Sequence, residues 1–141
     1  MCIWDRCCSL YPQSLIKEVK KKSANFGISF DGDGDRIICC DEKGKIIDGD
    51  KILACLSEYI FNKSRPGVNA IVGTLMSNRG LEKFVNNIGL KFYRSNVGDK
   101  FVFQLMKKNN CFLGGEQSGH IILKEFVPLS LIHIWLCRRA N

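Results

Sequence analysis

Asp31-Gly32-Asp33-Gly34-Asp35-Arg36 decides how this chain is interpreted, because an apolar run stands on each side of it. Phe26, Ile28 and Phe30 alternate with small residues before the loop, and Ile37-Ile38-Cys39-Cys40 follows it. Short apolar runs of this kind are typical of strands. We therefore predict one strand at 26–30 and a second from residue 37, with the acidic loop between them.

The loop carries three carboxylates within five residues, at Asp31, Asp33 and Asp35. Like charges this close repel one another. A bound hard cation relieves the repulsion, because carboxylate oxygens suit Mg²⁺, Ca²⁺ or Mn²⁺. The intervening glycines allow the tight backbone that such a site needs, and Arg36 offers a planar donor for a phosphate beside the metal. The loop therefore predicts a divalent cation next to a phosphate site.

Two other interpretations of the acidic loop compete with this one. The first is a solvated acidic turn. The second is an EF-hand, since Asp31, Asp33, Asp35 and Glu42 fall at positions 1, 3, 5 and 12 of such a loop. Position 6 of an EF-hand needs glycine, but here it is Arg36, and the flanking runs are strand-like instead of helical. The EF-hand is therefore set aside.

The rest of the chain alternates helices and strands. We expect a helix from Pro12, a turn at 41–44 that returns through 46–47, a helix from Asp50, a strand at 68–72, a helix at 79–87, a strand at 91–94, a helix through 101–106, and strands at 111–113 and 121–123. This order predicts an α/β fold with helices layered on a mixed, largely parallel sheet. On the helix from Asp50, the expected apolar face contains Ile52, Leu53, Leu56, Tyr59 and Ile60.

Composition excludes several classes of protein. The net charge of +7 comes from 21 Lys and Arg against 14 Asp and Glu. Without the flanks it is +5, mostly from the lysines of one predicted helix at 17–22, which favours a solvated helix face over nucleic-acid binding, because nucleic-acid binding favours basic residues interleaved with aromatics. No apolar run is long enough for a membrane span. The adjacent pairs among the eight cysteines lack zinc-site spacing. We expect Cys39, Cys40, Cys55 and Cys111 to be small buried residues in a reducing cytoplasm.

Three more motifs follow the acidic loop. They are Gly73-Thr74-Leu75-Met76-Ser77-Asn78, Val97-Gly98-Asp99-Lys100 and Gly115-Glu116-Gln117-Ser118-Gly119-His120. In order and spacing, the four motifs resemble the α-D-phosphohexomutase family, and within it the branch that acts on glucosamine phosphates. The resemblance runs from about Cys7 to about Leu123.

The resemblance implies a role for each motif. Asp31, Asp33 and Asp35 would bind Mg²⁺, and Arg36 and His120 would be the catalytic residues. Substrate-binding residues would be Glu116, Ser118, Asp99, Lys100, Ser77 and Asn78. Simpler roles remain open for some of them: Arg36 as an internal salt bridge, His120 as a structural residue, Asp99 as a carboxylate favoured by a helix dipole, and Asn78 as a helix cap.

The resemblance also implies a domain organisation. Residues 7–48 would be the C-terminal part of a second domain that carries the metal loop, and residues 49–128 most of a third domain that carries the sugar-binding loop. We expect residues 1–6 and 129–141 to be non-native flanks. Apart from Trp4, residues 1–6 and 129–134 match one short library-preparation transposon end translated forward and as its reverse complement. The family's phosphoserine loop and its phosphate-binding C-terminal domain are expected in missing domains of a parent chain.

The implied activity belongs to that parent. It would interconvert glucosamine 6-phosphate and glucosamine 1-phosphate through a phosphoserine enzyme and a bisphosphate intermediate, for peptidoglycan precursor synthesis. Two alternatives stay open: a phosphomannomutase or phosphoglucomutase relative, and a non-catalytic module that binds a metal or a sugar phosphate. Without the serine loop, the chain alone is expected to be inactive.

Overall fold

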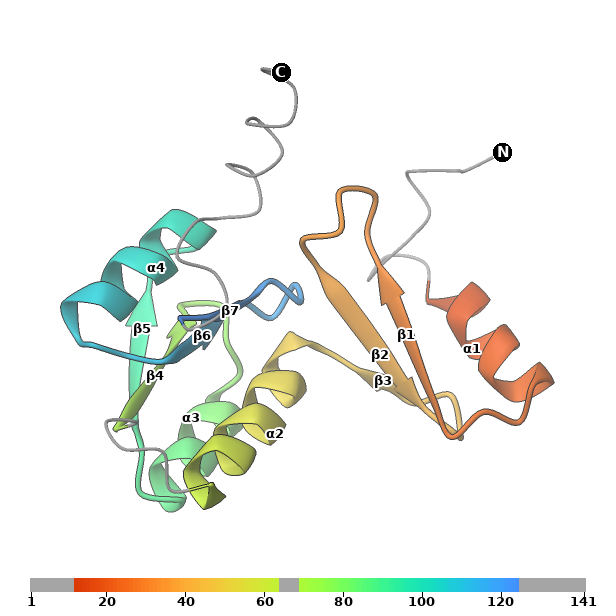
Figure 1. Cartoon of the computed structure of the whole chain (residues 1–141), viewed down its shortest axis with the longest axis horizontal. Helices are drawn as coiled ribbons and strands as arrows, with labels where there is room; N and C mark the ends of the chain where they lie inside the picture. The colour runs from red at the N-terminus through yellow and green to blue at the C-terminus, as the bar shows by residue number, and fades with distance from the viewer. Residues whose placement is uncertain (1–11, 64–68, 125–141) are drawn as a thin grey trace.

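The computed structural model of the chain describes residues 12–63 and 69–124. Within them, two neighbouring units follow one another along the chain (Figure 1): a small sheet with one helix, and a larger sheet with three helices. The expected flanks 1–6 and 129–141 lie outside the described residues, and so do Cys7 and Cys8. Val68, the first residue of the expected strand 68–72, also lies outside them.

The first unit is built around the acidic loop. Helix α1 (Gln13–Lys21) packs on an antiparallel sheet of β1 (Phe26–Phe30), β2 (Ile37–Asp41) and β3 (Ile46–Ile47), in the order β1-β2-β3. The pair Phe30 and Ile37 closes the β1–β2 hairpin, so the loop lies at its tip. Gly44, with a φ of +82°, donates to the carbonyl of Asp41 at 2.9 Å, which confirms the predicted turn at 41–44.

The second unit contains a four-stranded sheet in the order β5-β4-β6-β7. Its strands are β4 (Ala70–Thr74), β5 (Lys91–Ser95), β6 (Leu113–Gly115) and β7 (Ile121–Leu123). β5, β4 and β6 are parallel, and β7 is antiparallel, which confirms the predicted mixed, largely parallel sheet. β4 and β6 each begin two residues later than predicted from the apolar runs at 68–72 and 111–113.

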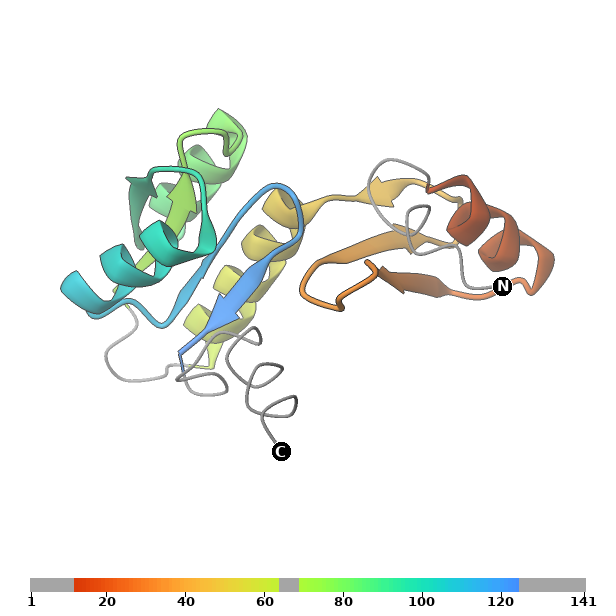
Figure 2. The same cartoon turned by 90° about the horizontal axis from the view of Figure 1, so that it is seen from above.

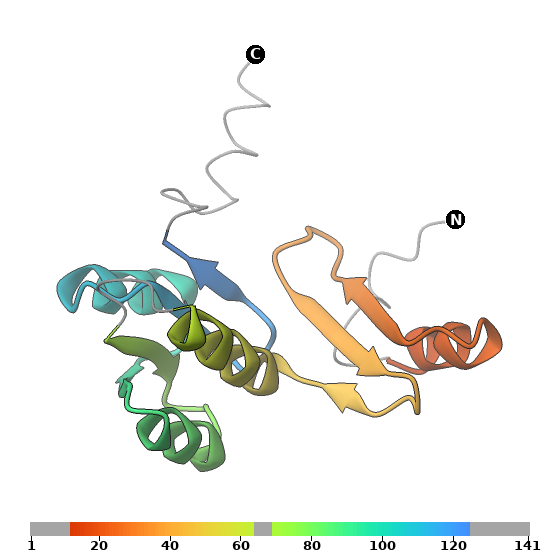
Figure 3. The same ribbon diagram turned by 60° about the horizontal axis from the view of Figure 1, so that its bottom comes forward.

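Three helices cover the two faces of this sheet: α2 (Gly49–Asn62), α3 (Arg79–Asn87) and α4 (Asp99–Lys108). α2 and α3 lie together on one face and α4 on the other (Figures 2 and 3). The alternation of side chains along β4 explains this, because Ile71 packs in the core under α2 and α3, and Ala70 and Val72 pack in the core under α4.

Two burial predictions on α2 are wrong: Tyr59 is 59% exposed, and Cys55 is exposed. The polar Ser57 is instead fully buried in the core, where its hydroxyl donates to the carbonyl of Leu53 at 2.5 Å. The buried positions predicted for Cys39, Cys40 and Cys111 are confirmed, and burial raises the pKa of each of these thiols. In the described part of the chain, no helix is both long and apolar enough to cross a bilayer.

Candidate functional site

Asp31 shapes the acidic loop. Its Oδ1 accepts the backbone N–H groups of Gly34, Asp35 and Arg36 at 3.0, 3.1 and 3.2 Å. Gly34 has a φ of +75°, a backbone conformation that residues other than glycine rarely adopt. The loop therefore curls around one carboxylate instead of extending between its strands.

The curled loop brings three carboxylates together. One oxygen each from Asp31, Asp33 and Asp35 lies within 4.8 Å of the others. Oδ1 of Asp35 is buried, and no described residue hydrogen-bonds to it. Buried polar atoms are normally paired, and an all-oxygen donor set suits a hard cation. These residues therefore fit the divalent cation that the sequence predicts.

The carboxylates differ in their affinity for protons. Partial burial acts to raise the pKa of Asp31. This effect is outweighed by hydrogen bonds from the backbone N–H groups of Arg36 and Asp35 and with the side chains of Asp35 and Asp33, so the pKa of Asp31 lies below 3.8. Burial raises the pKa of Asp35 above 3.8. The hydrogen bond with Asp31 and the charges of Asp31 and Asp33 act in the same direction, and His120 opposes them. A cation beside Asp35 would oppose the effect of the neighbouring carboxylates, which raise the pKa of Asp35.

Arg36 forms the internal ion pair that was one of its two expected roles. Its Nε lies 3.7 Å from Oδ2 of Asp31 and 3.9 Å from Oδ1 of Asp35. The side chain is 52% exposed, so its remaining N–H groups are accessible to solvent. The catalytic role of Arg36 stays a prediction.

The loop between β6 and β7, residues 116–120, docks against the acidic loop. Ile37 donates its N–H to the carbonyl of Gly119 at 3.0 Å, and Nδ1 of His120 lies 3.4 Å from Oδ2 of Asp35. Both of these side chains are mostly buried, with 14% exposed for His120 and 17% for Asp35. The two motifs, far apart in sequence, therefore form one continuous polar region.

Glu116 joins this loop to the loop after β5. Its Oε1 accepts the N–H of Gly98 at 2.6 Å, and its Oε2 accepts the hydroxyl of Ser118 at 3.1 Å. One carboxylate thus connects two of the predicted sugar-binding motifs. In a complex with a sugar, hydroxyls that donate to Glu116 would replace the N–H of Gly98 or the hydroxyl of Ser118.

A pocket of about 450 Å³ lies beside Glu116. It is lined by Ile38, Ile46, Asp48, Thr74, Met76, Val97, Glu116, Gln117 and Ser118. Several of these residues follow the carboxyl ends of β4, β5 and β6, where α/β sheets bind their ligands. The acidic loop contributes no residue to this pocket, and it contacts the 116–120 loop through Asp35 and His120.

The remaining predicted site residues do not line this pocket. Asn78 caps α3 by accepting the N–H of Gly80 at 2.7 Å, and the buried Ser77 hydroxyl accepts the N–H of Thr74 at 3.1 Å. Asp99 lies in the first turn of α4 and accepts the N–H of Lys100 at 2.6 Å. A substrate role for Ser77, Asn78, Asp99 and Lys100 stays a prediction.

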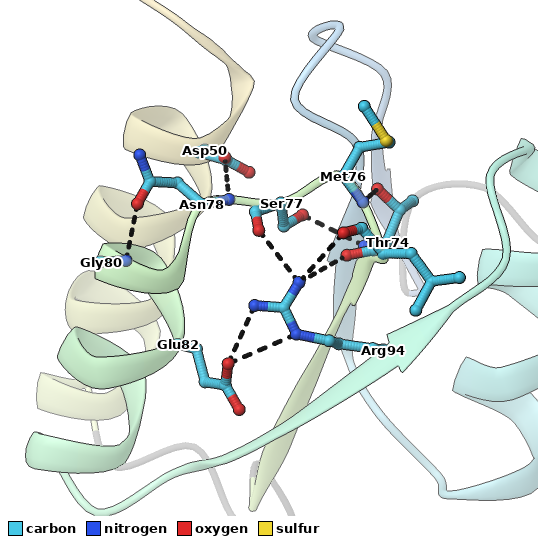
Figure 4. Close-up of polar contacts among 9 residues, drawn as sticks. Asp50, Thr74, Met76, Ser77, Asn78, Gly80, Glu82 and Arg94 are labelled. Atoms are coloured by element: carbon cyan, nitrogen blue, oxygen red, sulfur yellow. Dashed lines mark hydrogen bonds and ion pairs between the residues drawn. The ribbon is translucent and has the colours of Figure 1, made fainter.

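Three charged residues near the pocket were not predicted from the sequence (Figure 4). Arg94 pairs with Glu82 at 2.9 Å and donates to carbonyls of the 74–77 turn, and Asp50 accepts the N–H of Asn78 at 2.7 Å. Arg94, Glu82 and Asp50 stand on different elements, so no local pattern marks them. The available signals were Asp50 and Glu82, each an acid in the first turn of its helix.

Residues 48–130 match the family profile described as phosphoglucomutase/phosphomannomutase, alpha/beta/alpha domain III. The chain is 49% identical over 120 residues to a phosphoglucosamine mutase of Thermodesulfovibrio yellowstonii and 54% identical over 120 residues to one of Pelagibacter ubique. Each alignment covers 85% of this chain and 27% of the relative, so the chain spans about a quarter of those proteins.

A solved structure agrees with these relatives. A phosphoglucomutase/phosphomannomutase family protein of Burkholderia thailandensis superposes with a TM-score of 0.74 at 28% identity, over 82% of this chain and 26% of that one. The four motifs, the fold and the matches agree, and the chain belongs to the α-D-phosphohexomutase family, with phosphoglucosamine mutases among its near relatives.

Proposed function

We propose that the chain is the part of a phosphosugar mutase that carries the metal loop and the sugar-binding loop, as domains bounded at 7–48 and 49–128. The parent enzyme interconverts glucosamine 6-phosphate and glucosamine 1-phosphate in the cytoplasm, as a step toward peptidoglycan precursors. The observation that carries the proposal is the docking of the acidic loop on residues 116–120, through Ile37 and Gly119 and through Asp35 and His120.

Each residue has a role in this proposal. Asp31, Asp33 and Asp35 hold Mg²⁺, which when bound supplies positive charge to a phosphoserine phosphate contributed by the parent chain. Arg36 adds a second positive charge at the same place from its exposed N–H groups. Glu116 and Ser118 bind sugar hydroxyls in the adjoining pocket. Asp99, Lys100, Ser77 and Asn78 do not line the pocket and are proposed to bind other parts of the substrate. His120, between the carboxylates and the sugar, moves a proton at the reacting hydroxyl.

The sugar assignment rests on the relatives named phosphoglucosamine mutase. A mutase with another sugar would have the same metal loop, so the assay must compare sugars. The parent gene, recovered by reading outward from this segment, is expressed and assayed with glucosamine, glucose and mannose phosphates. We expect the glucosamine phosphates to be converted with the largest kcat/KM.

Asp33 provides the test of the metal loop, because it is the exposed member of the three carboxylates. Asp33→Asn in the parent should lower kcat/KM by at least about 10²-fold, since transition-state charge loses its counter-ion. Glu42→Gln, which removes an exposed carboxylate outside the loop, is the matched control and should leave kcat/KM unchanged. Equal activity of the two variants, or no turnover of any hexosamine phosphate by the wild type, would contradict the proposal.

A further inference from the structure

We propose that Arg94 is a positioning residue for the substrate pocket: it holds the turn of residues 74–77 that presents Met76 to the pocket wall. The inference rests on the proposed function, because it assumes that this pocket takes the phosphosugar. Arg94 is not itself among the residues that line this pocket.

The contacts of Arg94 converge on the turn (Figure 4). Its Nη1 donates to the carbonyl of Ser77 at 2.9 Å, to that of Thr74 at 3.1 Å and, at a longer 3.4 Å, to that of Leu75. Three carbonyl dipoles that point at one place repel one another unless a strong donor stands between them. A guanidinium supplies that donor with a full positive charge.

The two central side chains of the turn are not packed against the rest of the protein, whereas Thr74 and Ser77 at its ends are buried. Leu75 is 62% exposed and Met76 is 66% exposed. Besides Arg94, the turn is tied by backbone and hydroxyl bonds: Leu75 donates to the carbonyl of Ser95 at 3.0 Å, and Ser77 donates to that of Thr74 at 3.1 Å. In such a turn, the position of Met76 depends on hydrogen bonds more than on an apolar anchor.

Arg94 is itself held in place on its other side. Its Nε and Nη2 donate to Oε2 of Glu82 at 3.3 and 2.9 Å, and its guanidinium lies 5.3 Å from the ring centre of Phe92. The side chain of Arg94 is 26% exposed. The planar fork therefore has one fixed orientation, in which Nη1 is left for the carbonyls.

Met76 and Thr74 connect this network to the ligand. Both line the pocket of about 450 Å³, together with Glu116 and Ser118. A turn that loosens would move Met76 relative to Glu116 and weaken substrate binding in the ground state and the transition state alike. Loss of such uniform binding raises KM and leaves kcat nearly unchanged.

The experiment compares Arg94→Met, Arg94→Lys and Glu82→Gln in the complete parent enzyme. Arg94→Met removes every donor at similar length, and we expect KM for glucosamine 1-phosphate to rise about tenfold with kcat within about twofold. Arg94→Lys keeps a charged donor that can reach the carbonyls, so its KM should be intermediate. Glu82→Gln removes the charge of the ion pair but keeps an amide oxygen that can accept the same two N–H groups, so Arg94 stays oriented; this variant should lower Tm with KM within about twofold of the wild type.

A second measurement reads the turn without activity. Amide hydrogen exchange at Leu75 and Ser77 should accelerate at least about tenfold in Arg94→Met, and Glu82→Gln should leave it unchanged. If exchange in Arg94→Met stays as in the wild type, or if Glu82→Gln raises KM as much as Arg94→Met, the positioning role is wrong. If the wild type turns over no glucosamine phosphate, the proposed function fails, and the exchange result alone decides whether Arg94 holds the turn.

Discussion

Gly119 lies where the 116–120 loop docks on β2, and its carbonyl accepts the N–H of Ile37 at 3.0 Å. It has a φ of +97°, and a side-chain carbon built on it would collide with the backbone carbonyl of Ile37. Gly34 has a similar φ of +75°, but nothing lies within 4 Å of the corresponding position. The two glycines thus share a backbone strain and differ only in the space around them, which makes them a matched pair.

We predict that Gly119→Ala destabilises the chain more than Gly34→Ala. The positive φ alone costs an alanine about 1 kcal/mol, which is the loss of unfolding free energy expected for Gly34→Ala. Gly119→Ala adds a backbone collision, so its loss should exceed about 2 kcal/mol. Urea unfolding of both variants, without added metal, measures the difference. Equal losses would mean that the 116–120 loop does not dock closely on Ile37.

At the scale of single elements, α3 shows what the sequence could predict. Its observed span, Arg79–Asn87, is the predicted one, because Asn78 as N-cap and Gly89 after the end are local signals that need no tertiary contact. β4 and β6 were misplaced by two residues because apolar runs extend beyond the paired strand. The pairing partners that set those bounds come from distant segments.

α2 shows the limit of periodicity. Tyr59 and Ile60 are adjacent apolar residues, and the helical pattern admitted both to the core face. Packing against α3 and β6 buries Ile60 to 5% exposure and leaves Tyr59 at 59%. The side that faces the core is chosen by the neighbours of the helix, so Ser57 is buried there although it is polar.

We therefore predict unequal effects of truncating these neighbours on α2. Ile60→Ala leaves a cavity in the core and should lower the free energy of unfolding by about 2–5 kcal/mol. Tyr59→Ala removes an exposed ring that has one cation–π contact, with Lys63 at 5.6 Å, and should cost less than about 1 kcal/mol. Thermal or urea unfolding tests the order, and a larger loss for Tyr59→Ala would contradict the observed face of α2.

For the whole molecule, the sequence indicated which motifs carry the site but not how they meet. The acidic loop was recognisable because all three carboxylates stand within five residues. The pair Asp35 and His120 and the pair Glu116 and Gly98 join segments that are distant in sequence, and so do the bonds of Arg94. Such contacts follow from sheet order and loop docking, which no local pattern encodes.

The pair Asp35 and His120 leads to a prediction about metal binding. A cation at the acidic loop draws the carboxylate of Asp35 toward itself and so weakens its contact with His120, now 3.4 Å away. The 116–120 loop should therefore respond to a metal that it does not bind. We expect Mg²⁺ titration of the whole chain to shift the amide signals of Gly119 and His120 together with those of residues 31–36, reversibly on chelation.

The variant His120→Asn tests whether the contact between His120 and Asp35 carries the effect of the metal to the 116–120 loop. It shortens the side chain that faces Asp35 and leaves the three carboxylates that bind the metal intact. In this variant, residues 31–36 should respond to Mg²⁺ as in the wild type, and the response at Gly119 should shrink. Two results would contradict the coupling: a wild-type response confined to the acidic loop, or an unchanged Gly119 shift in His120→Asn. With coupling, metal occupancy at one loop adjusts the residues beside Glu116 and the pocket, so the two motifs act as one site.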